Sequence, residues 1–157
     1  MKEEVFLEGQ SMTLRPLSLT DIEGDYVSWL NDPEVTAFNS HGETIYTKEK
    51  AIEYINRVTE DPAYVVLAII AKDSGKHIGN ITLQNIDLNN RNAEFAILIG
   101  NKDYWSKGVG HEAAALIIEY GFSKLNLHRI YCGTSHKNIG MQKLAIKLGM
   151  QEEGRRT

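Results

Sequence analysis

The sequence predicts an α/β (α+β) domain of three layers, in which a mixed, mainly antiparallel central sheet is flanked by helices. Two observations lead to this fold class. Three strand patterns joined by short polar turns occupy residues 64–99, and a helix, a strand and a second helix follow up to Gly149. Strands first, then helix–strand–helix, are typical of such domains. The 157 residues have the usual length of one domain, and we assign residues 1–157 to it.

The chain is expected to begin with a short strand and two helices. Met12–Leu17 predicts the strand, and Thr20–Glu23 has the form of a capping box at a helix start. The apolar residues that follow repeat at helical spacing: Ile22, Tyr26, Trp29 and Leu30. Asn31-Asp32-Pro33 ends this helix, because proline disfavours helical geometry in the residue before it. A second helix is expected between Thr47 and Asp61, so residues 35–46 form a loop long enough to be one wall of a site.

The middle of the chain predicts an antiparallel meander of Tyr64–Ala71, Ile78–Ile86 and Ala93–Ile99. The third of these strands is apolar on both faces apart from Glu94, so we expect it to be central. The next helix has one apolar face, formed by Ala114, Ile117, Ile118, Gly121 and Leu125. A strand around residues 128–133 and a last helix closed by Gly149 complete the pattern.

Composition excludes several classes of protein. The net charge of −4 disfavours a general nucleic-acid binder, which would be basic. No apolar run is long enough for a signal peptide or a membrane span, so the expected location is cytoplasmic, with no membrane partner. The single cysteine, Cys132, has no partner for an intrachain disulfide and fits a core position better than a nucleophile. The histidines show no metal spacing, so no metal is expected: His41, His77, His128 and His136.

The stretch YWSKGVGHEAAA, residues 104–115, has the form of a phosphate-binding loop. Its glycines precede a helix start, where consecutive backbone N–H groups bind phosphate. A Walker A loop is excluded because Lys107 precedes the glycines instead of following them. Gly108–Ala113 matches the dinucleotide fingerprint GxGxxA. In dinucleotide-binding folds, however, that fingerprint follows a parallel strand, and the next strand ends with an acid that binds the ribose. Here a meander precedes the loop, and the next strand ends without an acid.

The third template, Q/R-x-x-G-x-G/A after a long antiparallel strand, resembles the acetyl-CoA loop of the GCN5-related N-acetyltransferase (GNAT) superfamily. Trp105 stands where the superfamily usually has Gln or Arg, as in the Tyr-Trp-Gly-Lys-Gly-x-Gly form of the RimJ/RimL-like branch, apart from Ser106. Further segments resemble this branch in the right order: Trp29–Val35, Ile78-Gly79, Ala93-Glu94, Leu125–Ile130, and Asn138 with Lys147–Met150.

The resemblance implies a sheet splayed between the fourth and fifth predicted strands and acetyl transfer from acetyl-CoA to a primary amine by direct attack in a ternary complex. It places the pyrophosphate on the N–H groups of Lys107, Gly108, Val109, Gly110 and His111. Pantetheine would lie along Ile97, Leu98 and Ile99, and Asn138 would touch the cofactor arm.

The amine must lose a proton before it attacks, and Glu94 is the predicted base. It is the only carboxylate in an otherwise apolar strand, and a carboxyl buried in such surroundings titrates closer to neutral pH. The alternative is a strand-end glutamate that faces solvent. Many superfamily members carry a tyrosine seven residues after the asparagine, placed to protonate the thiolate. Ala145 occupies that position here, so water or another donor acts instead, or none is needed.

The acceptor is expected to be a small-molecule or peptide amine: a protein N-terminus, an amino-sugar nucleotide, a polyamine or an antibiotic. The residues expected to bind the acceptor follow the first helix: Asn31, Glu34, Phe38 and His41. A non-catalytic acyl-CoA-binding module is the alternative function. Relatives continue through two more strands after the last helix, whereas this sequence has room for one partial strand. Either the sequence is a fragment, or a homodimer supplies those strands.

Overall fold

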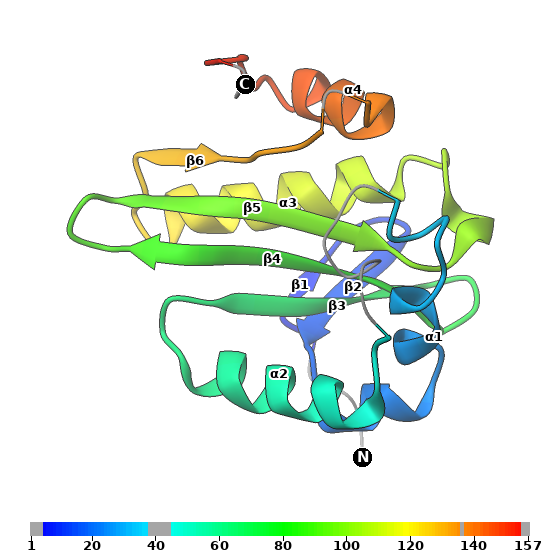
Figure 1. The fold of residues 1–157 in the computed structure, drawn as a ribbon. Helices are drawn as coiled ribbons and strands as arrows, with labels where there is room; N and C mark the ends of the chain where they lie inside the picture. The colour runs from blue at the N-terminus through cyan, green and yellow to red at the C-terminus, as the bar shows by residue number, and fades with distance from the viewer. Residues whose placement is uncertain (1–4, 38–44, 136, 155–157) are drawn as a thin grey trace.

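The sheet of the protein is curled and mixed (Figure 1). The structure, a computed structural model, describes residues 5–37, 45–135 and 137–154. In these residues six strands lie in sequence order: β1 (Leu7–Glu8), β2 (Met12–Pro16), β3 (Val65–Ala71), β4 (His77–Asp87), β5 (Asn92–Ile99) and β6 (Arg129–Tyr131). Neighbours pair antiparallel except β5 and β6, which are parallel. The predicted mixed, mainly antiparallel sheet is confirmed.

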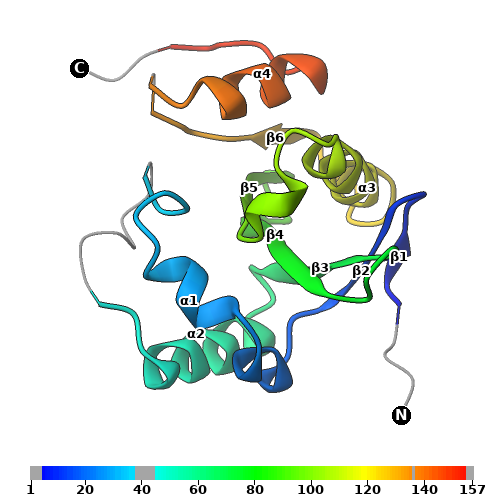
Figure 2. The same ribbon diagram turned by 90° about the vertical axis from the view of Figure 1, so that its right-hand side faces the viewer.

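Helices cover both faces of this sheet, so the three-layer arrangement is also confirmed (Figure 2). One face carries the 3-10 turn η1 (Leu19–Glu23), α1 (Tyr26–Leu30) and α2 (Lys48–Glu60). The other carries α3 (Val109–Ser123). The short turn η3 (Lys102–Tyr104) follows β5, and α4 (Ile139–Lys147) lies next to β6 (Figure 2). No helix of the described residues has both the length and the apolar character that a bilayer crossing requires.

Local signals placed α2 and the end of α4 correctly. Thr47 caps α2, its hydroxyl accepting from the Lys50 N–H at 3.2 Å. After α4 the chain turns at Gly149, whose φ is +86°. The Gly149 N–H bonds to Ile146 O, and the Met150 N–H bonds to Ala145 O, each at 3.0 Å. These two bonds are those of a Schellman cap, which glycine favours because it has no Cβ.

The start of the first helical segment differs from the prediction. It is the 3-10 turn η1, and its side-chain contact lies two residues before the capping box expected at Thr20–Glu23. The Ser18 N–H donates to Asp21 Oδ2 at 2.8 Å. The Asp21 carboxylate also accepts from Arg15 of β2, so the same acid binds the helix start and the neighbouring strand.

The prediction that residues 93–99 form the central strand is wrong. β3 and β4 occupy the middle of the sheet, and β6 pairs with β5 at only three positions. The apolar character of β5 has another cause, since helices cover both of its faces. Ala93 and Phe95 pack in the α3 cluster, and Leu98 packs against the α1–α2 cluster. The predicted strand 128–133 is likewise shorter, ending at Tyr131.

A buried polar network fixes η1 to the sheet. Arg15 donates to both oxygens of Asp21 at 2.9 and 2.6 Å. His77 Nδ1 lies 3.9 Å from Asp21 Oδ1, and its Nε2 lies 2.7 Å from Asn80 Oδ1. Burial lowers the pKa of His77 more than Asn80 and Asp21 raise it. Burial acts to raise the pKa of Asp21, but the hydrogen bonds from Arg15 and Ser18 outweigh it and leave this pKa low.

This network predicts a stability that depends on pH. Because the pKa of His77 is below 6.5 in the folded protein, protonation favours the unfolded state, and stability is lost as pH falls below about 6.5. Asp21, with its pKa below 3.8, stays charged down to pH 5. The Tm of the wild-type protein, measured by thermal unfolding, should therefore fall as the pH is lowered from 8 to 5. The Tm of His77→Gln should fall less over the same range. An equal fall in both proteins would contradict a buried neutral His77.

Candidate active site

The strands β5 and β6 separate early and form a fork. They pair at Asn92↔Arg129, Ala93↔Ile130 and Glu94↔Tyr131, and β5 then continues to Ile99 without β6. Here we use fork for the separation that follows the Glu94–Tyr131 pair. It is the predicted splay between the fourth and fifth predicted strands.

The backbone of β5 presents polar groups to this fork. The Gly100 N–H donates to Ile78 O at 2.9 Å, so in the alternating ladder the even-numbered residues of β5 bond to β4. The N–H and C=O groups of Ile97 and Ile99 therefore point to the fork, and those of Leu98 do not. The structure thus brings two of the three predicted pantetheine contacts to the fork through their main chain.

Trp105 occupies the edge of the fork. Its indole N–H donates to Ile99 O at 2.7 Å, which satisfies a carbonyl that β6 leaves without a strand partner. This contact gives a physical reason for an aromatic donor at the position where Gln or Arg was the more common expectation.

The loop before α3 leaves a row of backbone donors exposed at the helix start. The first α-helical bond is made by the Glu112 N–H to Gly108 O at 3.1 Å. The N–H groups of Val109, Gly110 and His111 accordingly have no acceptor among the described residues. The positive end of the helix dipole adds to these donors, and exposed Lys107 adds a full charge.

Glycine is favoured at the two positions of this loop for different reasons. Gly108 has φ +80°, a left-handed conformation that costs other residues about 1–2 kcal/mol. Gly110 is helical, and a Cβ placed there would meet only Ile97 Cδ1, at 3.7 Å. The donors therefore adjoin the fork, because Gly110 lies over the β5 residue whose backbone points into it.

Glu94 stands at the closed end of the fork. Its neighbours Ala93 and Phe95 point to α3, so Glu94 points to the α1–α2 face. It is half-buried, and its surroundings are polar instead of apolar as expected. Gln84 Nε2 and Asn85 Nδ2 donate to Glu94 Oε1 at 2.9 and 3.3 Å.

Tyr131 is a neighbour of Glu94 that the sequence did not single out. It is paired with Glu94 across the parallel strands, so the two side chains stand on the same face of the sheet. Only the strand register places Tyr131 beside Glu94, and this register cannot be deduced from the sequence. On the opposite face, burial and secondarily the charge of Glu94 raise the pKa of Cys132, which packs against the core as expected.

The remaining cofactor residue, Asn138, caps α4. Its Oδ1 accepts from the Met141 N–H at 3.1 Å, so part of its amide has a local structural role. No group of three His, Cys, Asp or Glu side chains that could hold a metal ion occurs in the part of the chain that the structure describes.

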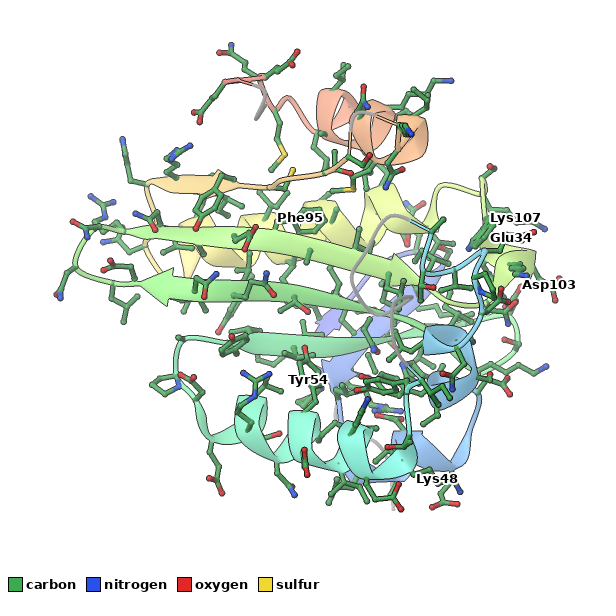
Figure 3. The ribbon with its side chains drawn as sticks, viewed as in Figure 1. Glu34, Lys48, Tyr54, Phe95, Asp103 and Lys107 are labelled. Carbon is green, nitrogen blue, oxygen red and sulfur yellow. The ribbon has the colours of Figure 1, made fainter. Side chains whose placement is uncertain are left out.

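The segment after α1 lies at the same end of the molecule as the predicted phosphate-binding loop. Lys102 of η3 forms ion pairs with Asp32 and Glu34, at 2.8 and 3.1 Å. Figure 3 shows Glu34, Asp103 and Lys107 together at this end. Trp29 of α1 packs on Gly100, where an added Cβ would lie 1.9 Å from the indole Cδ2.

The predicted acceptor residues divide into three groups. Glu34 is exposed near the loop, although Lys102 already binds its carboxylate. Asn31 has a structural role, since its amide binds both backbone groups of Tyr46, at 2.7 and 2.8 Å. Phe38 and His41 lie outside the described residues.

Comparisons with known proteins agree on one family. The family model described as an acetyltransferase (GNAT) domain matches residues 11–151. An uncharacterized N-acetyltransferase, p20 of Bacillus licheniformis, is 33% identical over 92% of this chain and 82% of the relative. Spermidine N(1)-acetyltransferase of Escherichia coli is 34% identical over 54% of this chain and 45% of its own. The structure of Vibrio cholerae spermidine N-acetyltransferase in complex with CoA and spermine superposes with a TM-score of 0.82, at 26% identity over 93% of this chain and 84% of that one.

Gly110→Ala should separate helix stability from cofactor affinity. The protein has room for the added methyl group, and alanine is the better helix former, so Tm should rise by about 2–4 °C. A pyrophosphate on the adjacent N–H groups would meet the methyl group, so the affinity for acetyl-CoA should fall roughly tenfold. Thermal unfolding and calorimetric titration measure the two effects.

Gly140→Ala is the matched control, because Gly140 holds the same position in α4 and an added Cβ comes no closer than 3.8 Å to another residue. It should change Tm alone. Unchanged acetyl-CoA affinity in Gly110→Ala would contradict a phosphate site at the start of α3.

Proposed function

Because the chain belongs to the acetyltransferase (GNAT) family and uses acetyl-CoA, we propose that it transfers the acetyl group to a small-molecule primary amine by direct attack. The observation that carries the proposal is the meeting of free backbone donors with a carboxylate at one fork. Val109, Gly110 and His111 supply the donors at its open side, and Glu94 stands at its closed end.

The chain's own residues fit the cofactor. The three N–H groups at the start of α3 would hold the pyrophosphate, with Lys107 as a counter-charge. The outward backbone groups of Ile97 would hydrogen-bond the pantetheine arm in place of a strand. Bound in this way, acetyl-CoA supplies the thioester that the amine attacks. Fixing both reactants at one fork lowers the barrier through orientation, by about 7–11 kcal/mol in favourable cases.

We assign to Glu94 the removal of a proton from the acceptor ammonium. Its Oε1 accepts from two amides, whereas Oε2 has no hydrogen-bond donor among the described residues. That oxygen is suited to accept the proton and, before that, to bind the ammonium by a charge-assisted hydrogen bond. The thiol of the product has a pKa near 8.5, so its departure needs no dedicated acid, in keeping with Ala145.

The relatives favour a small amine as the acceptor. Two proteins similar to this chain are spermidine N-acetyltransferases, and one is described with spermine bound. Lys102 pairs with both Asp32 and Glu34 and offsets one of their two negative charges, whereas Glu94 has no ion pair among the described residues; we infer that Glu94 is the main anionic contact of the acceptor. Polyamines therefore head the panel to be tested, followed by amino sugars and peptide N-termini.

Glu94→Gln should reduce kcat roughly 100-fold or more, because the amide cannot take up a proton. The affinity for acetyl-CoA should stay the same, since the side chain of Glu94 faces away from the donors of α3. Thiol release from acetyl-CoA, measured across the amine panel, gives the rate, and calorimetric titration gives the affinity.

Glu119→Gln, an exposed glutamate of α3, is the control and should match the wild type. Full turnover by Glu94→Gln would exclude Glu94 as the base. Tight binding of acetyl-CoA by the wild type, with no turnover on any amine, would instead identify a non-catalytic acyl-CoA-binding module.

A further inference from the structure

A bulge in β4 lies directly beside Glu94. The register of β4 and β5 is regular from Gly79↔Ile99 to Gln84↔Glu94, and the next pair is Asp87↔Asn92. One extra residue is therefore inserted in β4 between Gln84 and Asp87. Asn85 within it has φ +52°, a left-handed conformation that asparagine adopts more readily than most residues.

The bulge brings two consecutive side chains to the same carboxylate oxygen. In a regular strand, neighbouring residues point to opposite faces of the sheet. Here Gln84 Nε2 and Asn85 Nδ2 both donate to Glu94 Oε1, at 2.9 and 3.3 Å. The left-handed backbone of Asn85 accounts for this arrangement, because it breaks the alternation at that residue.

The turn that follows does not depend on the Asn85 amide. Asp87 holds it, with Oδ1 accepting from the N–H groups of Asn89 and Asn90 at 3.0 and 2.9 Å and Oδ2 accepting from the Asn90 side chain at 2.8 Å. The Asn85 side chain is exposed, so its amide contributes little to the core. Its contact with Glu94 is the one hydrogen bond found for this amide within the described residues.

We propose that Gln84 and Asn85 are positioning residues, which hold the Glu94 carboxylate by one oxygen and orient the other toward the acceptor amine. The inference rests on the proposed role of Glu94 as the base. Two donors on Oε1 restrict rotation of the carboxylate, so Oε2 keeps a fixed direction from one turnover to the next. Neutral amides suit this role, because they hydrogen-bond the carboxylate and orient it without transferring a proton to it.

Asn85→Gly tests the proposal without straining the bulge, because glycine accepts a positive φ. The variant should lose roughly tenfold in kcat/KM for the amine, the effect of one hydrogen bond to a charged group, with the KM for acetyl-CoA unchanged. Gln84→Met, which keeps the length of the side chain and removes its amide, should act in the same direction. Asn89→Gly is the control, since Asn89 is an exposed asparagine of the turn after β4 and its hydrogen bond to Asp87 is made by its backbone N–H, which glycine keeps.

The same substitutions in the Glu94→Gln background distinguish positioning from a structural effect. If the amides act through Glu94, Asn85→Gly and Gln84→Met should cause no further loss there. A full additional loss in that background, or no loss in the wild-type background, would overturn the proposal. If Glu94→Gln itself retained full turnover, the assignment of the base would fail first, and the positioning role with it.

Discussion

The early separation of β5 and β6 is the constraint on which the site depends. A strand that loses its neighbour leaves N–H and C=O groups without partners, which costs free energy unless another group binds them. Trp105 satisfies one of these groups, Ile99 O. The others form a ready-made ladder edge for an extended polar arm, and the free donors of α3 start over the same residues because Gly110 lies on Ile97. A cofactor with a pyrophosphate and an amide-containing arm meets both requirements together.

The two sides of the site are fixed to β5 and not directly to each other. On one side, Trp29 packs on Gly100, and Lys102 joins the segment after α1 to the turn that follows β5. On the other, α3 begins a few residues after that turn and packs on the opposite face of the strand. A shift of the C-terminal half of β5 would therefore move the proposed acceptor side and the proposed cofactor side together.

Local features of the site were predictable from the sequence, and contacts between strands were not. The predicted phosphate-binding loop depends on two glycines and on a helix start, which are contiguous, and Glu94 is recognisable as the one carboxylate of its strand. The amides beside Glu94 depend on a one-residue insertion in β4, and its pairing with Tyr131 depends on strand register. Neither has a local signal. For the same reason the position of β5 within the sheet was predicted wrongly, because burial of both faces does not specify how long each edge is paired.

Backbone strain in the structure gathers around the fork. Among the described residues, four residues other than glycine have a left-handed φ: Asn85, Arg91, Ser106 and Asn126. Asn85 faces Glu94, and Ser106 belongs to the phosphate-binding loop. Arg91 and Asn126 hold the paired end, where Arg91 Nε donates to Asn126 O at 2.8 Å and the His128 N–H donates to Arg91 O at 2.7 Å. Each such conformation costs on the order of 1–3 kcal/mol and persists only where its surroundings impose it. Their placement indicates that the fold tolerates a free-energy cost at the positions that keep the fork closed at one end and open at the other.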